Sequence, residues 1–222
     1  MRQTARAHQA SVRKSKSLMR CSLEVLVLMR ISTSLPDSKW REVADAARAF
    51  EKLGFDEAAA HEVQHDSFTT LVPATLSTHK IGLTTSVAIA FPRSPMIVAI
   101  LAQDLNVNSN GRFVLGLGSQ VKQHNERRFS TPWTPPAPRM GEYVQALRAI
   151  WRCWEKAAPL NFKCEHYNFT LMTPTFSPPP DWSANGANHN RRSRSGHAAT
   201  CGLSLRWCPP SCVLHPRRMR RL

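Results

Sequence analysis

The sequence has few acidic residues and lacks a long uncharged hydrophobic run. Over 222 residues it carries 15 Asp and Glu against 30 Lys and Arg, for a formal net charge of +15. A membrane-spanning helix needs about 20 apolar residues, and the longest candidate, residues 87–102, is interrupted by Pro92, Arg93 and Pro95. The shorter apolar run at residues 23–29 contains Glu24 and has no small-residue cleavage site, so it does not fit a secretory signal. We therefore expect a cytoplasmic protein with no membrane partner.

The positive charge is concentrated at the two ends of the chain. Residues 1–28 contain six basic residues and one acidic residue, and residues 181–222 contain eight Arg and one acidic residue. The 152 residues between them contain 16 basic and 13 acidic residues. This balance argues against a basic nucleic-acid-binding fold. The apolar content of 42% is compatible with a hydrophobic core in the central part.

The two ends lack the pattern of a folded domain. The tail, residues 181–222, contains Arg but no Lys and shows no helical or strand period. We expect an irregular Arg- and Cys-rich tail, read from G/C-rich coding sequence out of frame after about Pro180, with a natural disordered tail as the alternative. Residues 1–28 are expected to be a disordered basic leader. Four potential zinc ligands crowd the tail, but they lack the paired close cysteines of structural zinc sites; they are Cys201, Cys208, Cys212 and His215.

The central residues 29–180 alternate between strand and helix patterns. A β-branched and apolar run such as residues 81–91 is typical of a strand buried on both faces. The helix predicted after Pro36 follows the helical period and ends at Gly54, a residue suited to a C-cap. Four such strand–helix units fit either a doubly wound sheet or half of a (β/α)8 barrel. We predict strands at 30–35, 55–60, 81–91 and 112–118, helices at 36–53, 68–77, 95–105 and 140–154, a Pro-rich loop at 130–138 and a hairpin at 160–173.

The motifs distinguish between the two folds. The usual phosphate-binding glycine loops are missing from the sequence, and Gly116 and Gly118 form only a lone GxG. With its surroundings, however, the run at residues 86–129 (SVAIAFPRSPMIVAILAQDLNVNSNGRFVLGLGSQVKQHNERRF) resembles the luciferase-like monooxygenase superfamily. It is most similar to the branch of oxidoreductases that use coenzyme F420. Residues 52–68 and 138–155 support the same resemblance.

The resemblance implies an α/β fold, a partial (β/α)8 barrel of about four units. It implies a flavin-type cofactor across the C-terminal ends of the strands, which is where barrels carry their sites. Coenzyme F420 is the expected cofactor, with FMN as the alternative. Family members carry a bulge and a non-proline cis peptide in the third strand, and the matching position here is Ser86–Val87.

The resemblance also suggests site residues, all of which follow the ends of strands. Glu62 and His65 are the expected catalytic residues, since the family's active site is lined by acidic and histidine side chains at this loop and a histidine can transfer a proton near neutral pH. Asp66 lies in the same loop. We expect His124 and Arg112 to be structural or exposed, and no metal site. The expected cofactor-binding residues are Ser86, Val87, Arg93, Gly116, Gly118, Ser119 and Gln120.

The pattern ends before a whole barrel is formed. A full barrel needs about 250 residues, and strands five to eight have no expected counterpart after Pro180. We therefore predict a truncated oxidoreductase that transfers a hydride between reduced deazaflavin and a small organic substrate. Strands one and four would be open edges through which copies of the chain could pair. The alternatives are an FMN-dependent monooxygenase acting with oxygen, and an inactive fragment or a binding module that uses its basic tail.

Overall fold

The computed structural model describes residues 30–179 and 204–207. The fold described here is that of the unit that begins at Ser32. The expected basic leader at residues 1–28 and the four potential zinc ligands of the tail lie outside the described residues. None of the described helices is long and apolar enough to cross a membrane.

A parallel sheet organises this unit, and its neighbouring strands follow the order of the chain. β1 (Ser32–Ser34) pairs with β2 (Glu57–Ala60), β2 with β3 (Gly82–Thr85), and β3 with β5 (Phe113–Gly118), all in parallel. A doubly wound sheet reverses its strand order at a switch point, and no reversal occurs among these strands. The sequential order is that of a (β/α)8 barrel, as expected from the sequence.

The third predicted strand is interrupted. Instead of one strand over residues 81–91, the chain forms β3 and the two-residue β4 (Ala88–Ile89), and both pair with β5. The peptide bond between Ser86 and Val87, which lies between them, is cis. The expected bulge and cis peptide are therefore confirmed. An apolar, β-branched run predicts a buried strand but contains no signal for this interruption.

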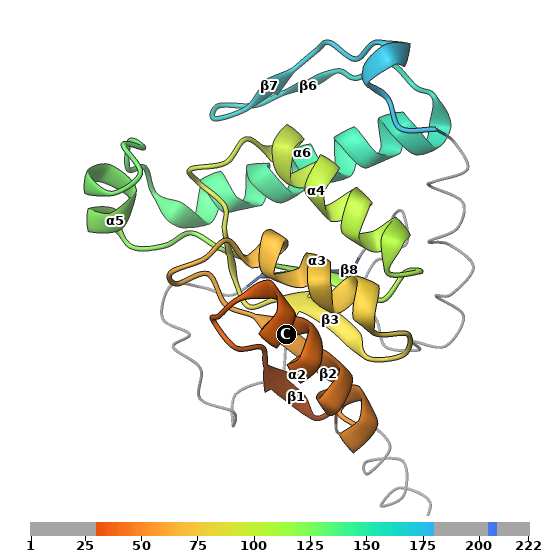
Figure 1. Cartoon of the computed structure of the whole chain (residues 1–222). Coiled ribbons are helices and arrows are strands. Elements are labelled where there is room, and N and C mark those ends of the chain that lie inside the picture. Colours follow the sequence, from red (N-terminus) through yellow and green to blue (C-terminus); the bar gives the residue numbers. More distant parts are fainter. Residues whose placement is uncertain (1–29, 180–203, 208–222) are drawn as a thin grey trace, which may run out of the picture. The chain divides into compact units, whose positions relative to one another are not determined.

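The helices cover one face of the sheet (Figure 1). α2 (Trp40–Leu53) ends at Gly54, which has a left-handed φ of 81° and caps the helix as expected. Asp66 caps α3 (Ser67–Ser77) by accepting a hydrogen bond from the backbone of Thr69. α4 (Pro95–Asn108) begins with Ser94 as its cap.

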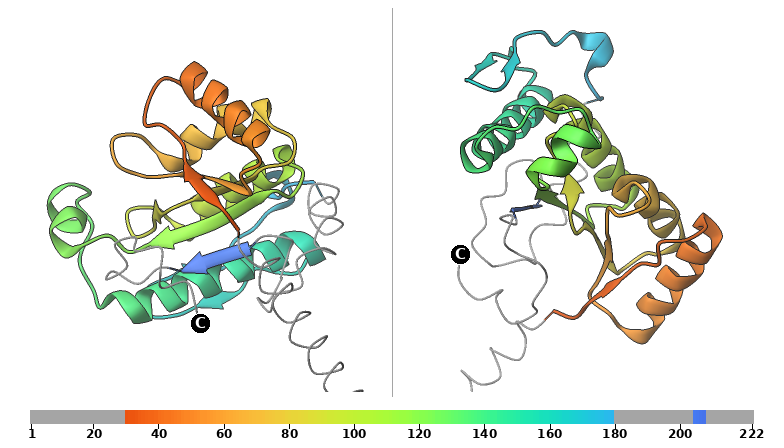
Figure 2. Two further views of the ribbon diagram at one scale, coloured as in Figure 1. Left: turned by 90° about the horizontal axis from the view of Figure 1, so that it is seen from below. Right: turned by 90° about the vertical axis from the view of Figure 1, so that its left-hand side faces the viewer.

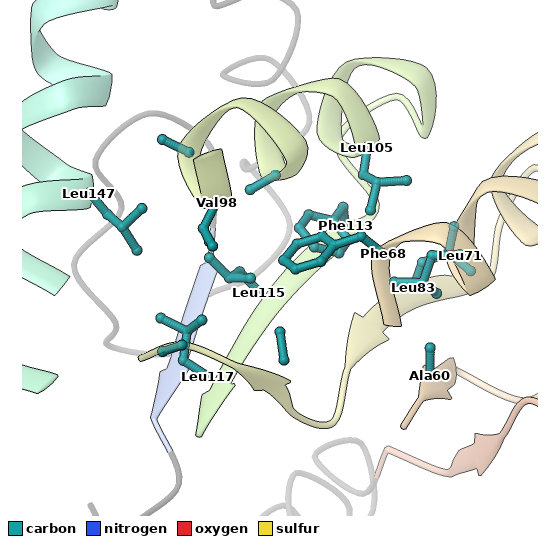
Figure 3. Close-up of a cluster of buried hydrophobic side chains, with 14 of the residues drawn as sticks. Ala60, Phe68, Leu71, Leu83, Val98, Leu105, Phe113, Leu115, Leu117 and Leu147 are labelled. Atoms are coloured by element: carbon teal, nitrogen blue, oxygen red, sulfur yellow. The ribbon is translucent and has the colours of Figure 1, made fainter. Parts of the chain in front are cut away.

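The core lies between these helices and the sheet. Alternate residues of each strand face it, because successive side chains of a strand point to opposite faces. Figure 3 shows Val98 and Leu105 of α4 directed at β5, and Phe68 and Leu71 of α3 near Leu83 of β3. All of these side chains are buried. Each contributes about 1.5–3 kcal/mol when fully removed from water. The helix-facing residues of β5 are Phe113, Leu115 and Leu117.

The longest helix, α6 (Pro136–Lys156), packs against α4. Trp151 on its buried face donates a hydrogen bond from Nε1 to the carbonyl of Ala99, at 3.3 Å. The helix begins within the segment predicted as a Pro-rich loop, because proline is well tolerated in the first turn of a helix. That loop prediction is therefore wrong for residues 136–138. The predicted hairpin is present as β6 (Phe162–Lys163) and β7 (Asn168–Phe169).

Three further elements were not predicted. α5 (Lys122–Arg127) follows β5, and a short 3-10 helix, η1, spans Pro174–Phe176. β8 (Ser204–Trp207) pairs in parallel with β5, and the two strands run side by side in Figure 2. The expectation that no strand follows Pro180 is thus wrong for residues 204–207. The fourth predicted strand, β5, is also not an open edge, because it has neighbours on both sides.

The close approach of β5 to the bulge requires glycine at position 116. A Cβ at Gly116 would lie 2.1 Å from the backbone oxygen of Thr85, whereas a Cβ at Gly141, on the exposed side of α6, would meet nothing within 4 Å. We predict that Gly116→Ala destabilises the protein by about 1–3 kcal/mol through overpacking. Gly141→Ala should stabilise it by about 0.5–1 kcal/mol. Urea unfolding of the full chain followed by circular dichroism checks both, and equal stability of the two variants would contradict the prediction.

Candidate functional site

Three polar groups meet where the first three strands end. His61 follows β2, and its Nε2 lies 2.8 Å from Oγ of Ser34, the last residue of β1. Its Nδ1 lies 2.6 Å from the carbonyl oxygen of Ser86, at the bulge. Ser34 precedes the core residue Leu35 and His61 follows the core residue Ala60, so these two side chains lie on the sheet face opposite the helices. Ser34 is exposed, and His61 and Ser86 are half-buried.

The partners of His61 define its tautomer. A carbonyl oxygen only accepts hydrogen bonds, so Nδ1 of His61 must carry a proton and donate it to Ser86. In the neutral imidazole Nε2 is then the acceptor, and the hydroxyl of Ser34 donates to it. The lone pairs of Ser34 Oγ remain available on the exposed side. The arrangement is a hydrogen-bonded chain that can pass a proton between the solvent side of the site and the imidazole.

A second cluster lies beside this chain and is held together by Arg93. The Nη2 atom of Arg93 lies 2.7 Å from Glu62 Oε1 and 2.5 Å from Asp66 Oδ2. Its Nη1 donates to Glu62 Oε2 at 3.0 Å and to the carbonyl of Ile89 at 2.7 Å. Glu62 Oε2 also accepts the backbone N–H of Ile89. The cluster therefore joins the loop after β2 to β4 and the segment that follows it.

The electrostatics of this cluster keep Arg93 charged. Burial alone would lower the pKa of Arg93, but its hydrogen bonds and charge interactions with Glu62 and Asp66 outweigh burial and raise it. Tyr143 of α6 donates its hydroxyl hydrogen to the carbonyl of Arg93 at 3.1 Å. Burial, reinforced by Tyr167, raises the pKa of Tyr143 well above its usual value, so this donor stays protonated.

These contacts give Glu62 and Arg93 partners other than those expected from the sequence. The side chain of Glu62 is only 8% exposed, and both of its oxygens contact Arg93. Arg93, expected to bind an anionic part of a cofactor, is paired with two carboxylates of its own chain. In the structure both residues fix the geometry of the loop and the bulge.

His65, the other expected catalytic residue, lies apart from His61. It is exposed, and its Nε2 is 3.6 Å from Oδ1 of Asp37. It lines a hollow of about 460 Å³ at the beginnings of α2 and α3, together with Asp66 and Trp40. Neither His61 nor Ser86 lines this hollow. The structure thus places His65 beside the strand-end site and not within the hydrogen-bonded chain.

The predicted residues at the end of β5 build the other side of the site. A Cβ at Gly118 would lie 2.5 Å from Cγ2 of Val87, so glycine here makes room for the bulge. Ser119 is buried, and its carbonyl accepts a hydrogen bond from the side chain of Asn125 at 2.9 Å. Gln120 has a left-handed φ of 58°, and its Oε1 accepts the N–H of Val121. These residues shape the loop that follows β5.

Arg112 and His124 were expected to be structural or exposed, and the structure agrees. Arg112 lies at the opposite end of β5 and donates to the carbonyls of Ser109, Ile81, Thr75 and Thr78. Burial lowers the pKa of Arg112, and the charge of Glu51 partly opposes this. His124 is exposed on α5.

His61 is the site residue that the sequence reasoning missed, together with its partner Ser34. A signal was present: Ala58 and Ala60 of β2 face the core, so strand alternation places Ala59 and His61 on the opposite face. Glu62, one residue later, points back toward the helix side, where Arg93 reaches it. The alternation of side chains along β2 is therefore sufficient to place His61 on the face opposite the helices.

Proteins of known sequence resemble this chain over part of their length. It is 46% identical over 152 residues to an uncharacterized protein of Mycobacterium tuberculosis, an alignment that covers 68% of this chain and 44% of the relative. It is 31% identical over 129 residues to another M. tuberculosis protein, provisionally named a coenzyme F420-dependent oxidoreductase, with 58% of this chain and 36% of the relative covered. The chain thus spans less than half the length of these relatives.

Solved structures share the fold. An F420-dependent secondary alcohol dehydrogenase in complex with an F420–acetone adduct aligns with a TM-score of 0.55 and 21% identity, over 68% of this chain and 50% of the other. The FMN-bound oxygenating constituent of 3,6-diketocamphane monooxygenase from Pseudomonas putida aligns with a TM-score of 0.54 and 15% identity, over 65% and 44%. The fold is accordingly a partial (β/α)8 barrel of the luciferase-like type. Residues 22–189 match the luciferase-like monooxygenase family model, and the chain belongs to that family.

Proposed function

We propose that this chain is a partial F420-dependent oxidoreductase whose site lies at the strand ends around Ser86–Val87 and His61. When bound, the reduced deazaflavin supplies a hydride to a small organic substrate, or oxidised deazaflavin accepts one from it. Residues 29–180 form the proposed catalytic half-barrel. The observation that carries the proposal is the Ser34–His61–Ser86 chain beside the bulge, on the sheet face opposite the helices.

The described residues fit the ring part of such a cofactor. Val87 offers an aliphatic surface and is half-buried, and the polar groups of Ser34 and His61 lie on the sheet face opposite the helices. A flat ring with polar edges needs this combination of apolar contact and a few positioned donors and acceptors. Arg93 is already paired with Glu62 and Asp66, so it is less suited to bind the anionic part. The rest of the expected set, Gly116, Gly118, Ser119 and Gln120, would act by shaping the loop and the bulge.

The choice of F420 over FMN rests on the relatives. One relative at 31% identity is provisionally named F420-dependent, and one structural neighbour holds an F420–acetone adduct. Another neighbour holds FMN, so an FMN-dependent monooxygenase is the second candidate. Association of copies through β1, which lies at one edge of the sheet in the described residues, stays a prediction, as does a cytoplasmic location.

Direct cofactor binding separates the candidates. We expect the purified full chain to change the fluorescence of F420 in a saturable titration and to bind FMN more weakly by about tenfold or more. Saturable binding of FMN alone would favour the monooxygenase. Failure to bind either cofactor would favour the inactive fragment.

The proton-transfer role of His61 gives a second test. We predict that His61→Gln lowers kcat for the oxidation of 2-propanol by oxidised F420 by roughly 10²-fold, because the Nε2 atom that accepts from Ser34 is placed to act as a general base, which contributes about 10²–10⁴-fold. The Kd for F420 should change little. His65→Gln is the matched control and should keep both values within about twofold. Equal losses in the two variants, or a large loss of F420 affinity in His61→Gln alone, would contradict the assignment.

The role of Arg93 gives a third test. Because Arg93→Met leaves two carboxylates of the cluster without their partner, we predict that it lowers the free energy of unfolding by about 3 kcal/mol. Arg48→Met removes an exposed ion pair with Asp45 and should cost less than about 1 kcal/mol. Urea unfolding without cofactor measures both. An Arg93→Met variant that is as stable as the parent but no longer binds F420 would instead establish Arg93 as a cofactor ligand.

A further inference from the structure

A further cluster of titratable side chains, separate from the Arg93 cluster, lies where the β6–β7 hairpin meets α6. The turn of the hairpin contains Glu165 and His166, and Glu142 lies on α6. Tyr167, next to His166, stacks edge-on against Tyr143 of α6 with ring centroids 5.4 Å apart. Arg139 of α6 donates a hydrogen bond to the hydroxyl of Tyr167 at 3.1 Å. These contacts hold the turn firmly against the helix.

Glu142 is held in place by the hairpin turn. Its Oε2 accepts the backbone N–H of His166 at 2.8 Å, which leaves Oε1 directed at the imidazole. A carboxylate oriented by a hydrogen bond to its other oxygen is the usual arrangement of a metal ligand.

The Nδ1 atom of His166 has no hydrogen bond within the part of the chain that the structure describes, although it is shielded from solvent. The His166 side chain is only 13% exposed. Nδ1 lies 3.3 Å from Oε1 of Glu142, within ion-pair distance, so the two atoms are close enough together to share one cation. A metal ion would give this nitrogen the partner of good geometry that the described residues do not supply.

We infer that Glu142, Glu165 and His166 bind a divalent transition-metal ion, for which Zn²⁺ is the best match. Ligand atoms of the three residues all lie within 4.8 Å of one another. Zinc holds nitrogen and oxygen ligands at about 2.1 Å, which in a tetrahedral site separates them by about 3.4 Å. The 3.3 Å between Nδ1 and Oε1 already matches this spacing. An imidazole ligand favours zinc over magnesium or calcium, which prefer oxygen.

The site would act as a clamp. Each strand of the hairpin has only two residues, and so short a hairpin has little stability by itself. An ion that joins Glu165 and His166 in the turn to Glu142 on α6 fixes the hairpin to the helix. Three protein ligands leave a fourth position for water.

Zinc titration of the full chain tests the site. After dialysis against a chelator, we expect isothermal titration calorimetry to detect a zinc site that Glu165→Gln weakens by about 100-fold or more. Glu165 is exposed, so this variant should fold normally. Glu155→Gln, an exposed acid on the same helix, is the matched control and should bind zinc like the parent. Equal zinc affinity in the parent and in Glu165→Gln would overturn the inference.

A stability measurement distinguishes this site from the cysteines of the tail. Saturating zinc should raise the Tm of the parent and of Glu155→Gln but not that of Glu165→Gln, since only an intact site links binding to the folded state. Without metal, all three should have the same Tm. With Co²⁺ in place of zinc, the absorption band of thiolate-bound cobalt should be the same in the parent and in Glu165→Gln, because the proposed site contains no cysteine. A zinc-dependent rise in Tm of the same size in all three proteins would overturn the inference.

Discussion

The site depends on the space that β5 leaves for the bulge at Ser86–Val87. Gly116 and Gly118 occupy positions where a Cβ would collide with the oxygen of Thr85 or with the side chain of Val87. Thr85 reinforces the approach, because its hydroxyl both donates to the carbonyl and accepts from the N–H of Gly116. Only because β5 approaches so closely can β3 and β4 both pair with it and the Ser86 carbonyl reach His61.

The Arg93 cluster provides a second fixed point on the other side of the bulge. One guanidinium satisfies two carboxylates and a backbone carbonyl, and Glu62 in turn accepts the N–H of Ile89. A buried ion pair recovers its desolvation cost only when such additional hydrogen bonds are made. The charged residues after β2 therefore fix the backbone of β4, while the adjacent His61 contacts Ser34 and the Ser86 carbonyl instead of the ion-pair cluster.

Much of the fold could be predicted from the sequence, because the helical period of residues 40–53 and 140–154 and the apolar strands leave few arrangements. The cis peptide was predicted from the family resemblance and not from the residues themselves, because an apolar, β-branched run has the same sequence pattern whether or not the strand contains a bulge. The site was predicted only in part. Residue type favoured Glu62 and His65, but the direction of each side chain depends on strand parity and on the partner that Arg93 provides. The hairpin cluster around His166 could not be predicted, because Glu142 and His166 meet only through tertiary packing.

The distribution of polar groups explains how a partial barrel can carry a site at all. The helix-facing side of the sheet is filled by large apolar side chains, and the residues on its other face at the strand ends are small or polar: Ser34, His61, Ser86 and Gly118. The edge strand β1 is only three residues long, which limits unwanted strand pairing. The same small residues leave room for a ring and allow the strands to approach one another closely, so the chemistry of the proposed site and the stability of this part of the barrel rest on one set of side chains.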